Sequence, residues 1–328
     1  MRIISLIASA TEIVCALGYQ DELVGRSHEC DFPASILDLP VATKPRFETG
    51  GSSKEIDDRV KAQVAERGAE DALGVYEVFA DKLRELKPTH IITQTQCEVC
   101  AVSLKDLEVA VRELTGFDAQ IVSLQPNSLG DVYEDFMRVA EAIDDPASGR
   151  RLVSDCRNRL QRIAQESYQL EPRPRVAGIE WADPLMAFGN WTPSLIGIAG
   201  GDEVLGKADR HSPQIDFAKL VAADPDVIVF SPCGFDLKRA LEDLEILEAN
   251  TGWGDLRAVK TNRVYVSDGN QYFNRAGPRL VETAEILAEI LHPECFSLGH
   301  ANAWRQVTSH KLSGKPEHQD PRGTLLAD

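Results

Sequence analysis

Strand-like and helix-like segments alternate along this chain, and this alternation limits the fold more than any other feature of the sequence. In the first half, short apolar runs at 2–6, 23–26, 90–93 and 120–124 have the length and composition of β-strands, and segments with helical spacing of apolar residues, among them 53–68 and 71–86, lie between them. Such an alternation is typical of a parallel sheet with helices on both faces. We therefore expect an α/β fold for the first half.

A long helical segment separates this half from a second alternation. Residues 147–171 carry apolar side chains on one stripe, and strand-like runs return at 175–179, 226–230 and 263–266. The chain is therefore expected to form two Rossmann-like lobes with parallel sheets, joined by one long α-helix, with a ligand cleft between the lobes. The expected units are lobes at 1–146 and 172–296, a linking helix at 147–171, and a polar tail without fixed structure at 297–328.

The composition narrows the class of protein. The chain has 328 residues, of which 43% are hydrophobic and 27% charged, as is usual for globular proteins. Its net charge of −17 argues against binding to nucleic acid or to anionic membrane surfaces. No stretch approaches the roughly 18 consecutive apolar residues of a membrane span. We therefore expect neither nucleic-acid binding nor membrane insertion.

The start of the chain and its cysteines bear on its location. Residues 1–6 run straight into a strand-like segment, and Glu12 interrupts the apolar core that a secretory signal would need. An odd number of cysteines, seven, in a chain without an export signal indicates reduced thiols. These features predict a cytoplasmic protein, although a periplasmic protein whose signal had been removed would look the same.

Four segments, in order along the chain, resemble those of a known family. Ser5–Gly18 resembles the opening S-L-x-P-S-x-T-E of class III ABC-importer solute-binding proteins, whose lobes are joined by a helical backbone, with Ala8 in place of the proline. Leu23–Ser27 resembles their next strand, Trp253–Tyr265 their W-x-x-L-x-A-V-x-x-x-R-V-Y stretch, and Gly277–Leu280 the start of their last helix. The resemblance extends over both lobes and is closest to the vitamin B12-binding branch.

The resemblance implies a non-catalytic protein that holds a small-molecule metal chelate, cobalamin or a related compound, between its lobes. It also implies an ABC importer permease as the partner. Two features differ from the exported members: the missing signal, and the cysteines within Ser27–Asp31 and Gln96–Ala101. The chain therefore resembles a signal-less, cysteine-bearing subgroup.

Loops that follow the strands are expected to line the cleft, because ligands of open α/β sheets bind at the carboxyl ends of the strands. These loops are rich in aromatic side chains, whose flat apolar faces suit a corrin or porphyrin ring. Trp191, between Gly189-Asn190 and Thr192-Pro193, is expected to face the cleft, whereas Trp181 fits the cleft and the core equally well. The predicted ligand-binding residues are Ser9, His28, Glu29, Gln96, Trp181, Trp191, Phe235, Tyr272 and Phe273.

Four cysteines also follow strand-like segments. Cys97 and Cys100 have the C-x-x-C spacing of redox and metal sites, and Cys30 and Cys233 come from other strand ends. Four thiolates suit zinc or an iron–sulfur cluster. We therefore predict that Cys30, Cys97, Cys100 and Cys233 bind a metal when the lobes close. A thiol or His28 could also ligate the metal of a bound chelate axially, and the other interpretation is that the cysteines are small buried hydrophobes.

Two functions therefore compete. The first, which we favour, is a cobalamin or metal-chelate binding protein, and the second is a cytosolic thiolate-ligated metal or iron–sulfur protein, or a thiol enzyme, that reuses the same fold. The sequence contains no phosphate loop of the G-x-x-x-x-G-K type and no G-x-S-x-G nucleophile motif. A scaffold that has lost its ligand is a third alternative, which nothing in the sequence favours.

Overall fold

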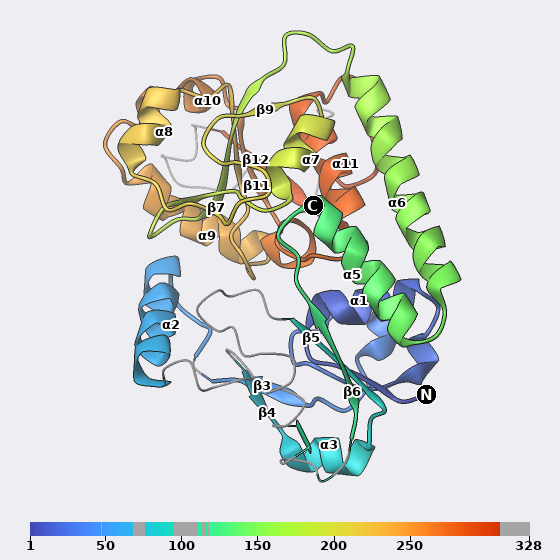
Figure 1. The fold of residues 1–328 in the computed structure, drawn as a ribbon. Helices are drawn as coiled ribbons and strands as arrows, with labels where there is room; N and C mark the ends of the chain where they lie inside the picture. The colour runs from blue at the N-terminus through green and yellow to red at the C-terminus, as the bar shows by residue number, and fades with distance from the viewer. Residues whose placement is uncertain (47, 68–75, 95–110, 113–115, 117, 309–328) are drawn as a thin grey trace, which may run out of the picture.

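The computed structural model describes residues 1–46, 48–67, 76–94, 111–112, 116 and 118–308, and it consists of two lobes with a long helix along one side (Figure 1). The sheet of the first lobe has four parallel strands in the order β2-β1-β5-β6, and β3 and β4 form a separate antiparallel pair. The elements of this lobe are β1 (Ile3–Ser5), α1 (Ala8–Ala16), β2 (Leu23–Arg26), β3 (Thr43–Pro45), α2 (Ser53–Arg67), β4 (Tyr76–Val78), α3 (Ala80–Leu86), β5 (His90–Gln94), β6 (Gln120–Leu124) and α5 (Leu129–Ala142).

Helices cover both faces of this first sheet. Successive residues of a strand point to opposite faces, and in β1 both Ile3 and Ile4 are fully buried. Ile3 belongs to the cluster that includes residues of α1 and α5, whereas Ile4 packs with Leu83 and Leu86 of α3. The short, wholly apolar runs of the sequence are therefore strands buried on both faces, as expected for a parallel sheet.

The second lobe contains a larger sheet in the order β12-β11-β10-β7-β8, with β9 paired to β7. Strands β7, β10 and β11 are parallel, and β12 adds an antiparallel edge. The elements of this lobe are β7 (Arg175–Trp181), β8 (Met186–Ala187), α7 (Thr192–Ile198), β9 (Asp202–Glu203), α8 (Phe217–Ala223), β10 (Val227–Phe230), α9 (Leu237–Glu248), α10 (Arg257–Lys260), β11 (Val264–Ser267), α11 (Leu280–Leu291) and β12 (Trp304–Val307).

The lobes are joined by α6 (Pro146–Ser167), which lies along one side of the molecule (Figure 1). The Asp145 side chain accepts a hydrogen bond from the Ser148 N–H at 3.1 Å and caps the helix, and proline stands in its first turn, where it is best tolerated. The helix packs on α5 of the first lobe and on α7 and α11 of the second. Its buried stripe consists of Val153, Cys156, Leu160 and Ile163.

The segment after residue 297 differs from the expectation of a tail without fixed structure, because residues up to 308 pack on the second lobe and add strand β12 to its sheet. Trp304 in β12 is 8% exposed and contacts the edge of the Tyr265 ring. The Glu289 carboxylate of α11 accepts hydrogen bonds from the Gly299 N–H at 2.8 Å and from Trp304 Nε1 at 3.2 Å. A single buried carboxylate thus holds a segment whose composition alone suggests disorder; residues 309–328 lie outside the described part of the chain.

The carboxyl ends of the parallel strands in the two lobes face each other (Figure 1). Asp31, in the loop after β2, contacts Asn270 and Arg275, which follow β11. The predicted two-lobed α/β architecture is therefore confirmed, and we call the region between the facing strand ends the cleft. Within the described residues, no helix combines the length and the apolar character that crossing a bilayer requires.

Candidate functional site

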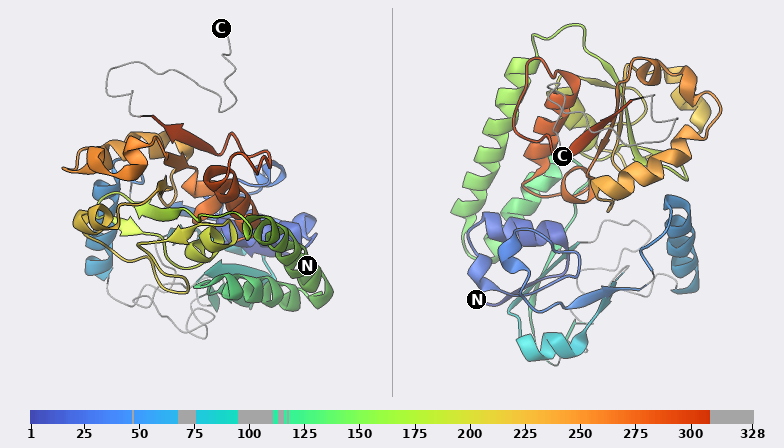
Figure 2. Two further views of the ribbon diagram at one scale, coloured as in Figure 1. Left: turned by 90° about the horizontal axis from the view of Figure 1, so that it is seen from above. Right: turned by 180° about the vertical axis from the view of Figure 1, so that it is seen from behind.

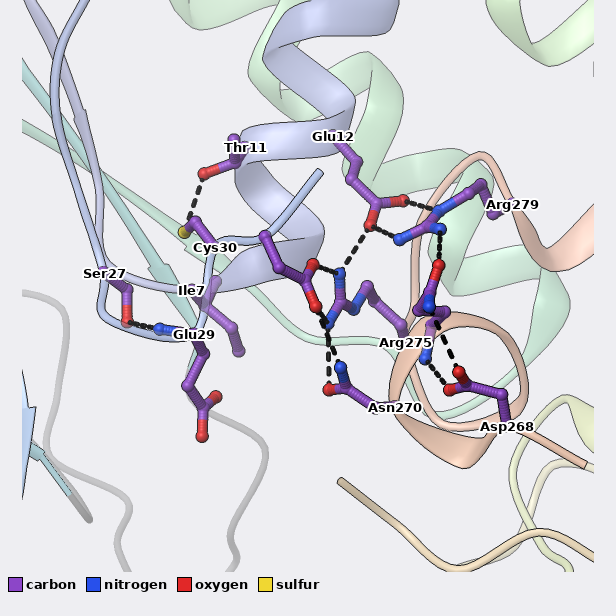
Figure 3. A network of polar contacts seen from close by, with 12 residues as sticks. Ile7, Thr11, Glu12, Ser27, Glu29, Cys30, Asp268, Asn270, Arg275 and Arg279 are labelled. Carbon is purple, nitrogen blue, oxygen red and sulfur yellow. Dashed lines mark hydrogen bonds and ion pairs between the residues drawn. The ribbon is translucent and has the colours of Figure 1, made fainter. Parts of the chain in front are cut away.

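A buried ion-pair network joins the two lobes at one end of the cleft (Figure 3). Glu12 of α1 accepts hydrogen bonds from Arg275 Nη1 at 2.9 Å and from Arg279 Nε at 3.0 Å and Nη2 at 2.5 Å. All three side chains are at most 7% exposed. Buried charges are stable only when they are paired and hydrogen-bonded, so this end of the cleft has a fixed geometry.

The network continues to the rim of the cleft. Arg275 also pairs with Asp31, whose carboxylate accepts a hydrogen bond from Asn270 Nδ2 at 2.8 Å. Burial opposes ionisation of Asp31, but the hydrogen bonds and charge of Arg275 prevail and lower the pKa of this carboxyl. Gln271 bridges Arg279 to Asp268. The charges of both arginines are thus already balanced by carboxylates of this protein.

The wall on the first lobe carries His28 and Glu29. The backbone N–H of His28 donates to the Thr43 hydroxyl at 3.1 Å, and His28 Nδ1 lies 2.7 Å from the same oxygen. Burial lowers the pKa of His28, which keeps the imidazole neutral at physiological pH. Glu29 is partly exposed, and its carboxylate points away from the ion-pair network (Figure 3). Both residues follow the end of β2, and their role in ligand binding stays a prediction.

Cys30, in contrast, does not face the cleft. It is 1% exposed within the core of the first lobe, and the Thr11 hydroxyl donates a hydrogen bond to its Sγ at 3.0 Å (Figure 3). Burial raises the pKa of its thiol. The prediction of Cys30 as a cleft metal ligand is therefore wrong, because the turn after β2 directs its side chain inward, and the interpretation as a small buried hydrophobe holds.

The wall on the second lobe carries Trp181, Glu180 and Cys233. The half-buried Trp181 ring meets Phe235 edge to face, with 5.2 Å between centroids. Glu180 accepts a hydrogen bond from the Ser212 hydroxyl at 2.5 Å, and burial raises the pKa of its carboxyl. Cys233 follows β10 and is an exposed residue. Partial burial of its sulfur, together with the charges of Glu180 and Glu29, raises the pKa of its thiol.

The predicted metal site of four cysteines is not assembled in the described part of the chain. Cys30 is enclosed in the first lobe, Cys233 lies across the cleft, and Cys97 and Cys100 fall outside the described residues, as does Gln96. Among the residues that the structure describes, no group of three or more His, Cys, Asp or Glu side chains is placed to hold a metal ion.

Three of the predicted aromatic ligand contacts belong to the core of the second lobe instead. Trp191 is 4% exposed, Phe235 is 2% exposed and Phe273 is fully buried. Trp191 Nε1 donates to the Phe273 carbonyl at 2.9 Å, and the Phe273 ring stacks on Phe188. Their large apolar area is buried on folding, and the indole N–H has an internal partner. The expectation that these three face the cleft is therefore wrong, and of the aromatic candidates Trp181 remains at the wall.

Two further predicted residues lie next to the ion-pair network. Ser9 is in the first turn of α1 and is 3% exposed, so its side chain does not present a surface to the cleft in this structure. Tyr272 is half-buried, with the Arg279 guanidinium 5.5 Å from its ring centroid and the His300 ring at its edge. The arginines themselves were not predicted. The signal was Glu12: a carboxylate among apolar residues of a core helix requires a cationic partner.

A shallow hollow, widely open to solvent, lies where the chain leaves β3. It has a volume of about 670 Å³ and is lined by Pro45, Arg46, Glu48, Thr49 and Gly50. The stretch that lines it connects the first lobe to α2.

Comparison with known proteins identifies relatives of this architecture. Residues 3–270 match the family described as periplasmic binding protein. The chain is 25% identical over 302 residues to the uncharacterized ABC transporter substrate-binding lipoprotein YvrC of Bacillus subtilis, covering 90% of this chain and 81% of the relative. It is 24% identical over 294 residues to a vitamin B12-binding protein of Vibrio cholerae, covering 87% and 86%.

Solved structures share the same fold. A periplasmic heme binding protein from Pseudomonas aeruginosa superimposes with a TM-score of 0.67 at 21% identity, covering 94% of this chain and 98% of that chain. The periplasmic vitamin B12 binding protein BtuF of Vibrio cholerae superimposes with a TM-score of 0.58 at 20% identity, covering 88% and 96%. The two-lobed arrangement is thus common to a heme-binding protein and a vitamin B12-binding protein.

Proposed function

Because the chain belongs to the periplasmic binding protein family, we propose that it binds a corrinoid, cobalamin or a close relative, in the cleft between its lobes. As a member of a family of binding proteins it is not an enzyme. The observation that carries the proposal is the composition of the two facing walls. The half-buried indole of Trp181 and the carboxyl of Glu180 come from the end of β7 on one wall, and Glu29, after β2, lies on the other.

The charges at the walls favour a corrinoid over haem. The rim of a corrin carries amide groups, whose N–H donors suit carboxylate acceptors such as Glu29 and Glu180. The rim of haem carries two carboxylates, which the Glu29 carboxylate would repel. Arg275 and Arg279 offer little compensation, because Glu12 and Asp31 already pair with them. The sequence relatives named vitamin B12-binding protein support the same choice.

Two further parts of the proposal concern the metal and the partner. His28 is neutral, the form in which imidazole binds metals, and with Cys233 it is our candidate for the axial position of the bound chelate. We propose an ABC permease as the partner, because a relative is named an ABC transporter substrate-binding protein. As the alternative to a periplasmic protein that serves such a permease, we propose a cytoplasmic protein with reduced thiols, and fractionation of cells that produce the untagged protein decides between the two.

A spectroscopic titration tests the ligand. Anaerobic protein titrated with hydroxocobalamin is expected to show a saturable shift of the corrin bands at a ratio of about one to one, and haemin is expected to bind more weakly. Trp181→Ala should weaken corrinoid binding by about tenfold, since a buried aromatic contact is worth about 1–2 kcal/mol. The matched control is Tyr168→Ala, at a ring that is 79% exposed at the end of α6, and its affinity should equal that of the wild type. Tighter binding of haemin than of the corrinoid would overturn the choice of ligand.

The same titration tests the axial ligand. In His28→Ala or Cys233→Ser, loss of the band shift with retained binding identifies the coordinating atom. If both variants shift the bands as the wild type does, neither side chain ligates the metal.

A further inference from the structure

One segment of the first lobe is attached to the second lobe. We call residues 48–62, the end of the β3–α2 connection and the first part of α2, the arm. By sequence the arm lies between β3 and β4 of the first lobe, yet Ile56 packs against the hydrophobic core of the second. Figures 1 and 2 show α2 standing apart from the first sheet and below α9. The arm therefore bridges the two lobes.

The arm is organised by its own residues. Ser52 and Glu55 form a capping box: the Glu55 carboxylate accepts the Ser52 N–H at 2.9 Å, and the Ser52 hydroxyl accepts the Glu55 N–H at 3.4 Å. Arg59 donates to the carbonyl oxygens of Glu48 at 2.8 Å and Gly50 at 2.5 Å, which ties the helix to the chain before it. The arm can thus move as one body.

Two side chains of α9 hold this body on the second lobe. The Arg239 guanidinium lies 3.8 Å from the Phe235 ring centroid and donates to the carbonyl oxygens of Thr49 at 2.7 Å and Gly51 at 2.9 Å. Asp243, which is 6% exposed, accepts the Ser53 N–H at 3.1 Å. A carboxylate of one lobe therefore satisfies a backbone donor at the start of a helix from the other.

The rest of the contact is small. The Ser53 hydroxyl accepts the Asp183 N–H at 3.2 Å, and of the described side chains of α2 it is Ile56 that packs on the hydrophobic core of the second lobe. Among the described residues the attachment therefore depends mainly on the hydrogen bonds of Arg239 and Asp243. Contacts of this kind open locally more easily than a packed core does.

The position of the arm relates it to the cleft. Helices α5 and α6 lie along one side of the molecule, and α2 lies on the opposite side in both views (Figures 1 and 2). The covalent link between the lobes and the arm thus flank the cleft from two sides. The hollow lined by Pro45 and Gly50 lies at the base of the arm.

We propose that the arm is a detachable strap, latched to the second lobe by Arg239 and Asp243, whose release admits the ligand to the cleft. The gating part of this proposal rests on the proposed function, whereas the latch does not. A docked arm obstructs both association and dissociation of a bound chelate. Weakening the latch should therefore raise both rates and change the equilibrium affinity little.

Hydrogen exchange of the full chain, measured without ligand, tests the latch. In Arg239→Ala and in Asp243→Ala, the amides of the arm are expected to exchange about tenfold faster or more, while those of β7 and β10 keep their rates. Asp243→Asn retains an acceptor oxygen for the Ser53 N–H and should change exchange far less. Lys238→Ala, at an exposed cation on the same helix, is the matched control. Exchange of the arm that is the same in Arg239→Ala as in Lys238→Ala would refute the latch.

Stopped-flow mixing with hydroxocobalamin tests the gate. Arg239→Ala is expected to raise the association and dissociation rates together, each by about fivefold or more, with the affinity within about threefold of wild type. Accelerated exchange of the arm without any change in these rates would overturn the gating role. If the wild type binds no corrinoid, the proposed function and the gate fail together, and the exchange experiment still decides whether the arm is latched.

Discussion

Removing the carboxylate of Glu12 should be the most damaging single substitution in the region where the lobes meet. Glu12→Ala deletes three hydrogen bonds from two guanidinium groups and removes the carboxylate that is hydrogen-bonded to the buried Arg279 guanidinium. Arg275 retains Asp31. Breaking one partner of a buried ion pair costs about 3–5 kcal/mol, a large part of the roughly 5–15 kcal/mol by which proteins are stable.

The assay is urea unfolding together with calorimetry. With an unfolding entropy of about 2.1 cal/mol/K per residue, a loss of about 4 kcal/mol in a chain of this size lowers the Tm by about 6 °C. Glu134→Ala, at an exposed carboxylate on α5, is the control and should stay within about 0.5 kcal/mol of wild type. The double substitution Glu12→Ala with Arg279→Ala should cost less than the sum of the single ones, by about 1–3 kcal/mol. A loss below about 1 kcal/mol for Glu12→Ala, with additive double-variant energies, would refute the reasoning.

Three further predictions concern the second lobe. Glu289→Ala should release β12, shift Trp304 fluorescence to longer wavelength and cost about 2–4 kcal/mol, whereas Glu289→Gln should cost less. The hydrogen bond that His300 Nε2 donates to the Glu285 carboxylate raises the pKa of His300, so this pair stabilises the fold fully below pH about 6.5 and loses that contribution as the pH rises through the raised pKa. Comparison of urea unfolding for wild type and His300→Gln from pH 5 to 9 should isolate this loss, and parallel curves would contradict it. Trp191→Phe should cost about 1 kcal/mol of stability through its lost hydrogen bond and leave corrinoid affinity unchanged. A tenfold loss of affinity would mean that Trp191 contacts the ligand.

The layered architecture followed from the sequence because buried parallel strands and amphipathic helices have distinct apolar patterns. The predicted helix at 53–68 corresponds to α2 at Ser53–Arg67. The predicted helix at 71–86 was only partly right: Tyr76–Val78 pairs with β3 as a strand, and a helix begins at Ala80. Apolar spacing over a short stretch fits both structures, and pairing with a partner distant in sequence decides between them.

The site was harder to predict because position in a loop does not fix where a side chain points. Cys30 and Glu29 are neighbours after the same strand, yet the thiol lies in the core and the carboxylate is partly exposed. Trp191 has the flanking Gly and Pro residues of an exposed loop, but its ring fills the core. A pattern that locates the ends of strands therefore locates the cleft, and leaves open which residues line it.

The contacts between the lobes show why the sequence did not indicate which residues line the cleft. Glu12 is separated from Arg275 by 263 residues and Ser53 from Asp243 by 190 residues. Glu12 required a cation on physical grounds, but the chain offers 35 lysines and arginines, and nothing local to any of them marks the right one. The two contacts also differ in kind. The contact of Glu12 belongs to a buried network, and its loss removes the carboxylate partner of a buried charge. The contact of Ser53 is one of a few hydrogen bonds at the start of an otherwise polar helix. The first therefore fixes the lobes at one end of the cleft, while the second is suited to opening, which is why we assign movement to the arm and not to the network.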